Sequence, residues 1–230
     1  MIIITGASKG IGKYLKTCFE EAGETVYGTC NSTTTNTSAK ETGLYKVDIA
    51  DPLQVGSFFQ SIKWTDADDK IVLINCAGAN YSAMAHKANI ADWGKVIDIN
   101  VKGTFNVIHA FLPKMRENQF GRIINFSSVV AQLGIVGTSC YAASKAALWG
   151  LSKSICIENA KYNITINNLN LGYFDIGMIQ EVPADALSLI KNRIPSGHLG
   201  EPKDIYKTIR YLMEIKYANG ISIDLNGGLY

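Results

Sequence analysis

A tyrosine and a lysine in the segment YAASK have a spacing that acid–base chemistry can use. Tyr141 and Lys145 are four residues apart, so on a helix their side chains lie on the same face. The lysine ammonium stabilises a phenolate, and we expect it to lower the pKa of Tyr141 toward working pH. A tyrosine with such a pKa can act as a general acid or base. A pair of ordinary surface residues is the alternative, because this spacing is common by chance.

Two serines, Ser127 and Ser128, follow the apolar segment RIINF. In a parallel α/β sheet the carboxyl end of such a strand faces the ligand crevice. Ser128 precedes Tyr141 by 13 residues, which makes it a candidate for a hydroxyl beside the tyrosine. A serine that only caps a turn is the alternative.

The segment TGASKGIG, which begins at residue 5, places Gly6, Gly10 and Gly12 directly behind the apolar run of residues 2–4. A strand, a glycine-rich turn and a helix form a phosphate-binding geometry, because backbone N–H groups at a helix N-terminus bind anions. We expect the missing Cβ atoms to let a pyrophosphate approach closely. The spacing differs from the G-x-G-x-x-G fingerprint, so these glycines alone could instead form a tight structural turn.

The elements that must position these residues alternate along the chain. Short, β-branched apolar runs are typical of parallel strands that are buried on both faces, and the segments between them have helical patterns. This alternation predicts an α/β fold: a doubly wound, Rossmann-type parallel sheet of about seven strands, with helices on both faces, in a single domain over residues 1–230. The expected strands are 1–5, 25–30, 44–47, 70–75, 122–127, 164–170 and 221–225, and the expected helices are 11–22, 52–62, 90–116, 141–160 and 203–214.

The composition is that of an ordinary globular chain of 230 residues, with 47% apolar and 18% charged residues. A net charge of +2 is too small to indicate a nucleic acid or an anionic membrane as a partner. No apolar run approaches the ~20 residues of a membrane span, and a strand that begins at residue 2 argues against a signal peptide. We therefore expect a cytoplasmic protein that binds neither nucleic acid nor membranes.

Metal chemistry and a Cys/His nucleophile are not expected. The five cysteines form no C-x-x-C pair, and an odd number of cysteines in such a chain indicates reduced thiols. The three histidines (His86, His109 and His198) are isolated and lack the spacing of metal ligands.

Taken together and in order, these segments resemble the short-chain dehydrogenase/reductase family over essentially the whole chain. The segments RIPSGHLGEP and NGISIDLNGG near the C-terminus are most similar to the β-ketoacyl carrier-protein reductases of that family. The resemblance implies four catalytic positions: Asn100 in VIDINVKG, Ser128, Tyr141 and Lys145. It also implies that the cofactor is bound by Gly6, Ser8, Lys9, Gly10, Ile11, Gly12, Asn31, Ser32, Asp48, Ile49, Asn75, Ala77, Gly78, Tyr141, Lys145, Gly172 and Phe174.

Three positions depart from the family pattern. Cys76 stands where the family's Asn-Asn-Ala-Gly motif has its second Asn, and Leu171 stands where a proline usually precedes Gly172. Proline fixes φ, so the loop after this strand is less constrained here. Ile176 replaces a frequent Thr, which removes a hydroxyl that could bond the nicotinamide side of the cofactor. None of these positions carries the chemistry.

The end of the second strand indicates which cofactor is used. Enzymes that prefer NAD place an acid about 20 residues past the glycine loop, where it binds the ribose 2′-hydroxyl. Here the strand ends Thr29-Cys30-Asn31-Ser32, and no acid follows before Glu41. Lys9 lies inside the glycine loop, where the resemblance places a basic residue near the 2′-phosphate. These residues favour NADP(H), although Lys9 could also be a solvated loop residue.

The resemblance implies hydride transfer between the nicotinamide and a carbonyl or alcohol carbon. Tyr141 would donate the proton, Ser128 would bond the same oxygen, and Lys145 would bind the nicotinamide ribose. Asn100 would hold a water that connects Lys145 to solvent. The apolar segment at about 173–197 is expected to form a lid over the substrate.

The substrate and partners are less closely defined by the sequence. A β-ketoacyl thioester, another ketone, a polyketide-like intermediate and a sugar-derived carbonyl all remain open. Carrier-protein reductases use arginines beside the site, but Gln119 and Tyr162 occupy those positions, which weakens an acyl carrier protein as partner unless Arg116 or Arg122 substitutes. The sequence is also compatible with a non-catalytic NADPH-binding regulator or an interaction scaffold. The resemblance, with the small residues of helix 141–160, also implies a homotetramer or homodimer.

Overall fold

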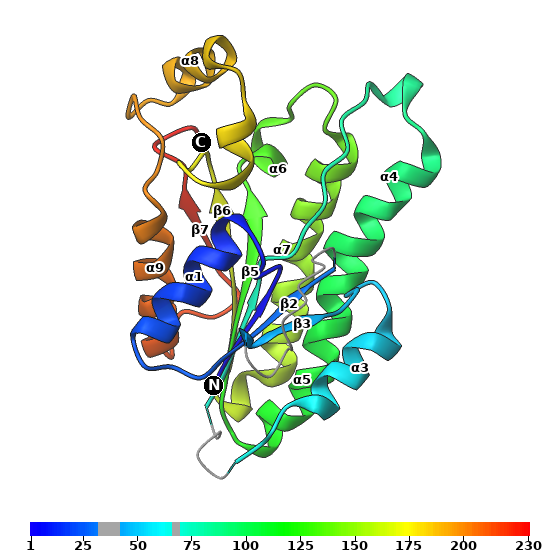
Figure 1. Cartoon of the computed structure of the whole chain (residues 1–230), viewed down its shortest axis with the longest axis vertical. Coiled ribbons are helices and arrows are strands. Elements are labelled where there is room, and N and C mark those ends of the chain that lie inside the picture. The colour runs from blue at the N-terminus through cyan, green and yellow to red at the C-terminus, as the bar shows by residue number, and fades with distance from the viewer. Residues whose placement is uncertain (32–41, 66–69) are drawn as a thin grey trace.

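The computed structural model describes residues 1–31, 42–65 and 70–230. Within these residues seven parallel strands form one sheet in the order β3-β2-β1-β4-β5-β6-β7 (Figure 1). The predicted α/β fold is confirmed, and every expected strand forms. The strands are β1 (Ile2–Thr5), β2 (Val26–Cys30), β3 (Leu44–Lys46), β4 (Ile71–Asn75), β5 (Gly121–Ser128), β6 (Ile164–Leu171) and β7 (Ser222–Leu225).

Helices cover both faces of the sheet. One face is packed by α1 (Gly10–Glu21) and α9 (Pro202–Glu214), which lie side by side in Figure 1. The other face is packed by α3 (Pro52–Ser61), α5 (Thr104–Glu117) and α7 (Ser139–Asn159). Among the described residues no helix has both the length and the apolar character needed to cross a membrane.

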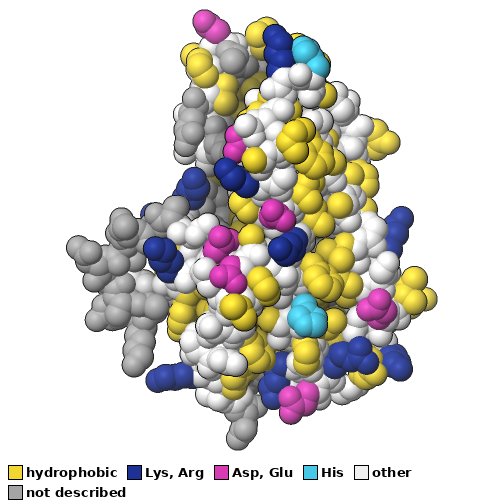
Figure 2. Space-filling model, turned by 90° about the vertical axis from the view of Figure 1, so that its right-hand side faces the viewer, with side chains coloured by type: hydrophobic (Ala, Val, Ile, Leu, Met, Phe, Trp, Pro, Cys, Tyr) yellow, Lys and Arg dark blue, Asp and Glu magenta, His cyan; other side chains and the backbone are white. Residues whose placement is uncertain are grey.

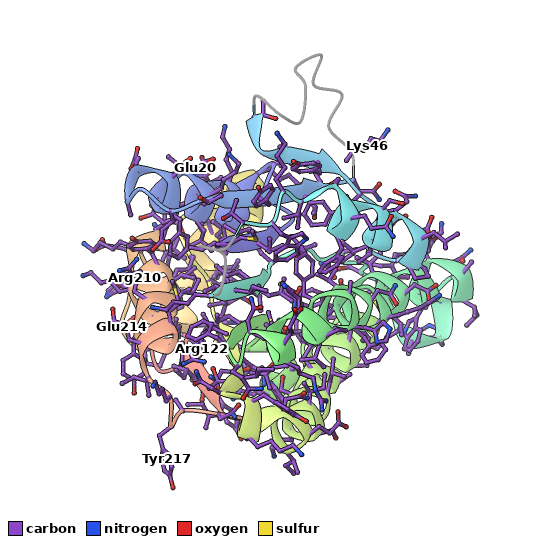
Figure 3. The ribbon with its side chains drawn as sticks, turned by 90° about the horizontal axis from the view of Figure 1, so that it is seen from below. Glu20, Lys46, Arg122, Arg210, Glu214 and Tyr217 are labelled. Carbon is purple, nitrogen blue, oxygen red and sulfur yellow. The ribbon has the colours of Figure 1, made fainter. Side chains whose placement is uncertain are left out.

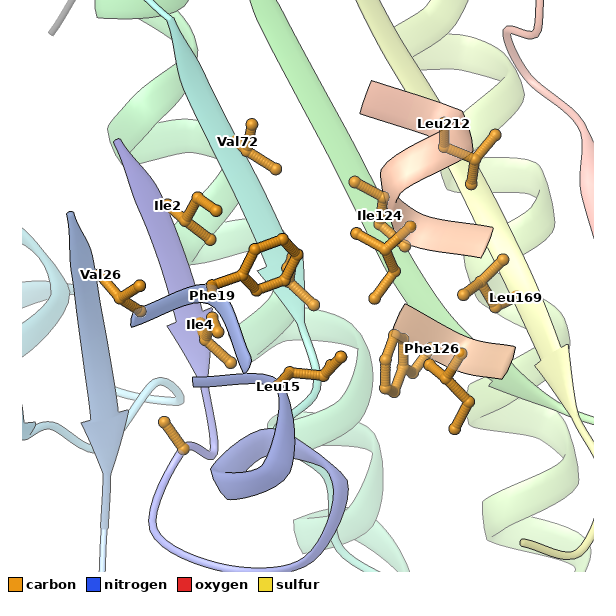
Figure 4. Packing of buried hydrophobic residues seen from close by; sticks show 14 of the residues in the cluster. Ile2, Ile4, Leu15, Phe19, Val26, Val72, Ile124, Phe126, Leu169 and Leu212 are labelled. Carbon is orange, nitrogen blue, oxygen red and sulfur yellow. The ribbon is translucent and has the colours of Figure 1, made fainter. Parts of the chain in front are cut away.

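Alternation along the strands produces the two hydrophobic cores. Ile2 and Ile4 of β1 pack with Leu15 and Phe19 of α1 (Figure 4), whereas Ile3 points to the opposite face. Successive side chains of a strand point to opposite faces, so a strand buried on both faces must be apolar at every position. This explains why β1 reads as a continuous apolar run.

The helix expected over residues 90–116 is interrupted. It begins as α4 (Ile90–Ile97), passes through a π-helical turn, η2 (Asp98–Gly103), and continues as α5. Gly103 is needed at the end of this turn, because a Cβ atom there would lie 2.8 Å from Cγ1 of Ile49. The wider turn carries Asn100, which is fully buried.

The segment expected to form a lid is a separately packed excursion between β6 and α9. It contains η4 (Gly177–Glu181) and α8 (Ala184–Arg193), which the sequence did not predict, and Figure 1 shows α8 beyond the carboxyl ends of the strands. Its apolar residues Ile179, Ile194 and Leu199 form a third, smaller cluster. The remaining short elements are η1 (Ala85–Lys87), α6 (Val130–Leu133) and η3 (Ala160–Tyr162).

A buried arginine closes the opposite end of the sheet, seen from below in Figure 3. Arg122 at the start of β5 is 1% exposed, and burial lowers its pKa. Its guanidinium donates hydrogen bonds to the main-chain carbonyls of Gly121 and Asn163 (both 2.8 Å) and Met213 (3.2 Å). It therefore ties β5 to the turn before β6 and to the C-terminal end of α9.

Candidate active site

Ser128 and Tyr141 come together at the carboxyl end of the sheet. Ser128 is the last residue of β5 and is 7% exposed, and Tyr141 lies in the first turn of α7. The Ser128 hydroxyl lies close enough to the Tyr141 phenol to lower its pKa. The Ser128 oxygen also accepts the N–H of Val130 at 3.2 Å. A proton donor and a second hydroxyl group therefore share one position, which is what a developing alkoxide needs.

Lys145 lies one turn beyond Tyr141 on α7 and is 5% exposed. Its Nζ donates a hydrogen bond of 2.7 Å to the carbonyl of Phe126 and lies 5.5 Å from the centroid of the Tyr141 ring. The Ser127 hydroxyl in turn donates to the Lys145 carbonyl at 2.9 Å. The lysine is thus held against β5, directly below the serine–tyrosine pair.

The expected lowering of the Tyr141 pKa is wrong. Burial raises the pKa of Tyr141 above its ordinary value of 10.0; the nearby Ser128 hydroxyl acts in the opposite direction, and the Cys76 thiol adds to the rise. Burial also lowers the pKa of Lys145 from 10.5 to about 8. Burial is the largest cause of both shifts, so Tyr141 remains a protonated phenol that is suited to act as an acid.

Asn100 joins α7 to the loop after β4. Its side-chain amide donates to the carbonyl of Ala79 and to the hydroxyl of Ser144, both at 2.9 Å, and its Oδ1 accepts the N–H of Ala79 at 2.8 Å. A Cβ atom on Gly78 would lie 3.3 Å from Oδ1 of Asn100 and 3.4 Å from Nζ of Lys145. The structure therefore places Gly78 close to both Asn100 and Lys145.

In the glycine turn between β1 and α1, two of the three glycines make room for the protein's own backbone and not, as expected, for a ligand. A Cβ atom on Gly6, where φ is +69°, would lie 2.8 Å from Cα of Ala77, and one on Gly12 would lie 2.3 Å from the Gly6 carbonyl oxygen. These two glycines therefore let the protein's own backbone segments pack. Gly10, where φ is +53°, has more room, with its nearest neighbour, Cα of Gly177, at 3.5 Å.

The first turn of α1 fits an anionic group such as a pyrophosphate. Lys9 is the N-cap residue, and its side chain makes no capping hydrogen bond. The N–H groups of the first helical turn are therefore not bonded by a capping side chain, and the N–H of Gly12 is near enough to the Cys76 thiol to favour its ionised form. Amides without a capping side chain and the helix dipole together favour a phosphate at this position.

The residues that we expect near the adenosine end of the cofactor differ in exposure to solvent. The N–H of Ala7 donates to the carbonyl of Thr29 at 2.8 Å, which brings the glycine turn against the end of β2. Lys9 and Asn31 are exposed on either side of this contact, whereas Cys30 is 5% exposed. Ser32 lies outside the described residues, together with Glu41.

The side chains of Ile49 and Phe174, two other expected cofactor contacts, are buried in the protein, so only their main-chain atoms can contact a cofactor. The Ile49 side chain is buried against Gly103, and the carboxylate of the neighbouring Asp48 accepts the N–H of Ala50 at 2.9 Å. The Phe174 ring is 6% exposed and packs in the core between α1 and α9. Gly172 lies against Asn226, where a Cβ atom would come within 2.7 Å of Cα.

The structure also adds one residue that the sequence did not single out, Ser144, and gives contacts to two that it did, Ser127 and Cys76. Ser144 bonds Asn100, and Ser127 bonds the main chain of Lys145. Burial raises the pKa of the Cys76 thiol to about 12, so this group is a neutral neighbour of Lys145. The double serine at 127–128 and the departure from the family motif at Cys76 were the sequence signals for two of these, and Ser144 gave none.

The comparisons with known proteins agree with this geometry. The sequence pattern of the short chain dehydrogenase family matches residues 1–187. The chain is 34% identical to acetoacetyl-CoA reductase from Rhizobium meliloti over 237 residues, which are 99% of this chain and 97% of that protein. It is 34% identical to the 3-oxoacyl-(acyl-carrier-protein) reductase FabG of Thermotoga maritima over 239 residues, 99% of this chain and 96% of that protein. It is 29% identical to human (3R)-3-hydroxyacyl-CoA dehydrogenase over 251 residues, 100% of this chain and 95% of that protein.

Proposed function

The chain belongs to the short-chain dehydrogenase family, and on this premise we propose that it is an NADPH-dependent reductase of β-ketoacyl thioesters. The carbonyl-reductase activity follows from the relatives, which are named acetoacetyl-CoA reductase and 3-oxoacyl-(acyl-carrier-protein) reductase. The observation that carries the proposal is that Ser128 and Tyr141 lie together beside a buried Lys145, whose Nζ is 5.5 Å from the centroid of the Tyr141 ring.

Each residue has a separate part in the reduction. A bound nicotinamide supplies the hydride to the carbonyl carbon. Tyr141 gives its phenolic proton to the carbonyl oxygen, so the ketone becomes a secondary alcohol, and Ser128 donates a hydrogen bond to the same oxygen as negative charge develops. Lys145 supplies positive charge below the tyrosine, and Asn100 keeps Gly78 and Ala79 against the lysine.

The residues around the glycine turn favour NADPH over NADH. Lys9 and Asn31 are exposed beside the contact between Ala7 and Thr29, and neither is acidic. A 2′-phosphate there would meet one positive charge and one amide. A carboxylate at the end of β2, which NAD-binding chains use to bind the ribose 2′-hydroxyl, is absent from the described part of this strand.

The two arginines considered as substitutes in carrier recognition have other contacts. Arg122 is buried at the amino end of the sheet, so the expectation that it could contact a carrier is wrong. Arg116 is half-buried; it donates to the Tyr162 hydroxyl at 2.6 Å and lies 4.1 Å above that ring. Gln119 donates to the carbonyl of Arg116. These contacts favour a coenzyme A thioester over a carrier-bound one.

We also propose that the protein forms a homodimer or homotetramer through α7. The small residues Ala143, Ala147 and Gly150 are exposed, so they do not pack this helix against its own sheet. The side of the molecule on which α4 lies carries many hydrophobic side chains between scattered charges (Figure 2). Phe105 of α5 is 45% exposed and stacks on the His109 ring. Light scattering that finds a monomer at micromolar concentration would contradict this assembly.

The test of the activity is a turnover assay that follows consumption of reduced nicotinamide. Acetoacetyl-CoA, an acetoacetyl thioester of a carrier protein, a free β-keto ester and a sugar-derived ketone are compared with NADPH and with NADH. We expect the highest kcat/KM for acetoacetyl-CoA with NADPH. Turnover of the free ketones without turnover of either thioester would overturn the proposed substrate class, and no turnover of any compound would favour a non-catalytic, NADPH-binding role.

A further inference from the structure

A row of buried polar side chains crosses the sheet just below the active site. Asn75 of β4, Asn125 of β5, Asn168 of β6 and Ser222 of β7 are register partners on neighbouring strands. The three asparagines are between 0% and 4% exposed. Three polar residues side by side inside a doubly covered sheet are costly unless they bond one another, because buried amides must satisfy their donors and acceptors.

The side chains do form a continuous chain of hydrogen bonds, and it passes through α7. Asn75 donates to Oδ1 of Asn125 at 2.8 Å, and Asn125 donates to the hydroxyl of Ser152 at 3.1 Å. Ser152 then donates to Oδ1 of Asn168 at 2.9 Å, and Asn168 donates to the hydroxyl of Ser222 at 3.3 Å. Every bond runs in the same direction, from β4 toward the edge strand β7.

The first two of these hydrogen bonds connect the cofactor segment after β4 with α7, which carries Tyr141 and Lys145. Asn75 immediately precedes Cys76, Ala77 and Gly78, and the N–H groups of Cys76 and Ala77 both donate to Oγ1 of Thr5. Oδ1 of Asn75 has no hydrogen-bond partner among the described residues. Within these residues, the bond from Nδ2 of Asn75 to Oδ1 of Asn125 is therefore the only hydrogen bond that holds the Asn75 side chain. The orientation of Asn75 therefore depends on Asn125.

The same residue restrains the catalytic helix. Ser152 and Lys145 are both on the buried face of α7, seven residues apart, which is about two helical turns. At Lys145 the helix is bonded to β5 through Ser127 and the Phe126 carbonyl, and at Ser152 it is bonded to β5 through Asn125. Two attachment points fix both the position and the tilt of the helix relative to the strand.

We propose that Asn125 is a positioning residue, which sets α7, and with it Tyr141 and Lys145, in register with the Asn75–Gly78 segment of the cofactor site. The proposal rests on the reductase function proposed above. Asn125 is itself neither an expected catalytic residue nor an expected cofactor contact; it acts through Asn75, which is an expected cofactor contact, and through Ser152. Misplacement of a catalytic group by about 1 Å can reduce the rate by up to ~100-fold, so such a restraint matters for kcat.

The chain offers a matched control in Asn168. Like Asn125 it is buried in an inner strand, accepts one side-chain hydrogen bond and donates another. Its bonds, however, connect α7 to β7, which is the edge away from the cofactor segment. Asn125→Val and Asn168→Val therefore remove the same number of bonds from equally buried positions, but only the first breaks the connection between α7 and β4.

The experiment measures kcat, the KM for NADPH and the thermal midpoint of both variants with acetoacetyl-CoA. We expect Asn125→Val to lower kcat by about tenfold and to change the KM for NADPH by less than about twofold, whereas Asn168→Val changes kcat by less than about twofold. The thermal midpoint should fall by a similar amount, roughly 3–8 °C, in both. Equal losses of kcat, or an unchanged kcat in Asn125→Val, would overturn the proposal.

A second measurement does not depend on substrate. Hydrogen exchange of the amides between Tyr141 and Ser152 should be faster in Asn125→Val than in Asn168→Val, and equal rates would contradict the restraint on α7. If Asn125→Val does not fold, Ser152→Ala takes its place in both assays, with the same expectations and the same refuting results. An inactive wild-type protein would count against the proposed reductase function, and the exchange comparison would still decide on the role of Asn125.

Discussion

We expect the buried charge of Lys145, in the candidate active site, to lower the free energy of unfolding relative to a variant without that charge. Lys145 is 5% exposed, and no carboxylate is among its hydrogen-bond partners in the described chain; its Nζ donates to the carbonyl of Phe126. Burial lowers its pKa from 10.5 to about 8. We therefore predict that Lys145→Met, which keeps an unbranched side chain and removes the charge, abolishes turnover and raises the free energy of unfolding at pH 7.

The size of the gain follows from the two pKa values. A decrease from 10.5 to about 8 corresponds to about 3.4 kcal/mol, since one pKa unit is worth about 1.36 kcal/mol. The variant also leaves the Phe126 carbonyl without its donor, which costs about 1–3 kcal/mol. The expected net gain at pH 7 is about 1–2 kcal/mol.

The sign of the pH dependence distinguishes this cause from a change in packing. Below about pH 8 the lysine is charged in both states, so the wild-type folded state carries the whole desolvation penalty. Between about pH 8 and pH 10.5 the unfolded chain binds more protons than the folded chain, so the wild type gains stability with rising pH. At about pH 9 its penalty has fallen to roughly 2 kcal/mol, and the advantage of the variant should shrink by about 1.3 kcal/mol.

Urea unfolding at pH 7 and at pH 9, at one ionic strength, measures this difference directly. Titrating groups that do not interact with Lys145 contribute equally to both proteins and cancel, and the neighbouring Cys76 thiol, with a pKa of about 12, is neutral in both folded proteins at these pH values. Lys153→Met, at an exposed position of the same helix, is the control and should change stability by less than about 0.5 kcal/mol at either pH. A Lys145→Met variant that is less stable than wild type at pH 7, by an amount that does not change at pH 9, would refute the reasoning.

Three further predictions test the site and the scaffold. Tyr141→Phe should lower kcat by about 10²–10⁴-fold and leave NADPH binding, measured by cofactor fluorescence, nearly unchanged; turnover close to wild type would remove Tyr141 from the mechanism. The double change Lys9→Ala with Asn31→Asp should move the NADPH/NADH ratio of kcat/KM by roughly 10²-fold toward NADH, and an unmoved ratio would show that the 2′-phosphate is bound elsewhere. Arg122→Leu should reduce the free energy of unfolding by about 2–4 kcal/mol in urea, because the guanidinium's hydrogen bonds to three main-chain carbonyls are lost, and a neutral result would show that water replaces the guanidinium.

Much of the architecture could be read from the sequence because it depends on local patterns. Runs such as Ile2–Ile4 indicate strands whatever they pack against, and the turn residues between them mark where strands end. The spacing of Tyr141 and Lys145 places them on one face of any helix, and Ser128 at the end of its strand had to face the crevice. All seven strands, and the grouping of Ser128, Tyr141 and Lys145 at one end of the sheet, followed from such local rules, whereas their proposed catalytic roles came from the family resemblance.

Only the tertiary structure decided the properties that depend on partners far away in the chain. The sequence predicts a lowered pKa for Tyr141 from the nearby ammonium, but the surrounding core raises it, since burial depends on every element packed around the site. The sequence also favours Gly6 and Gly12 as space for a ligand, but the chain's own backbone at Ala77 and Gly6 fills that space. No periodicity marks Asn75, Asn125 and Asn168 as one row, because strand order and register bring them together, and register is set by packing across the whole sheet.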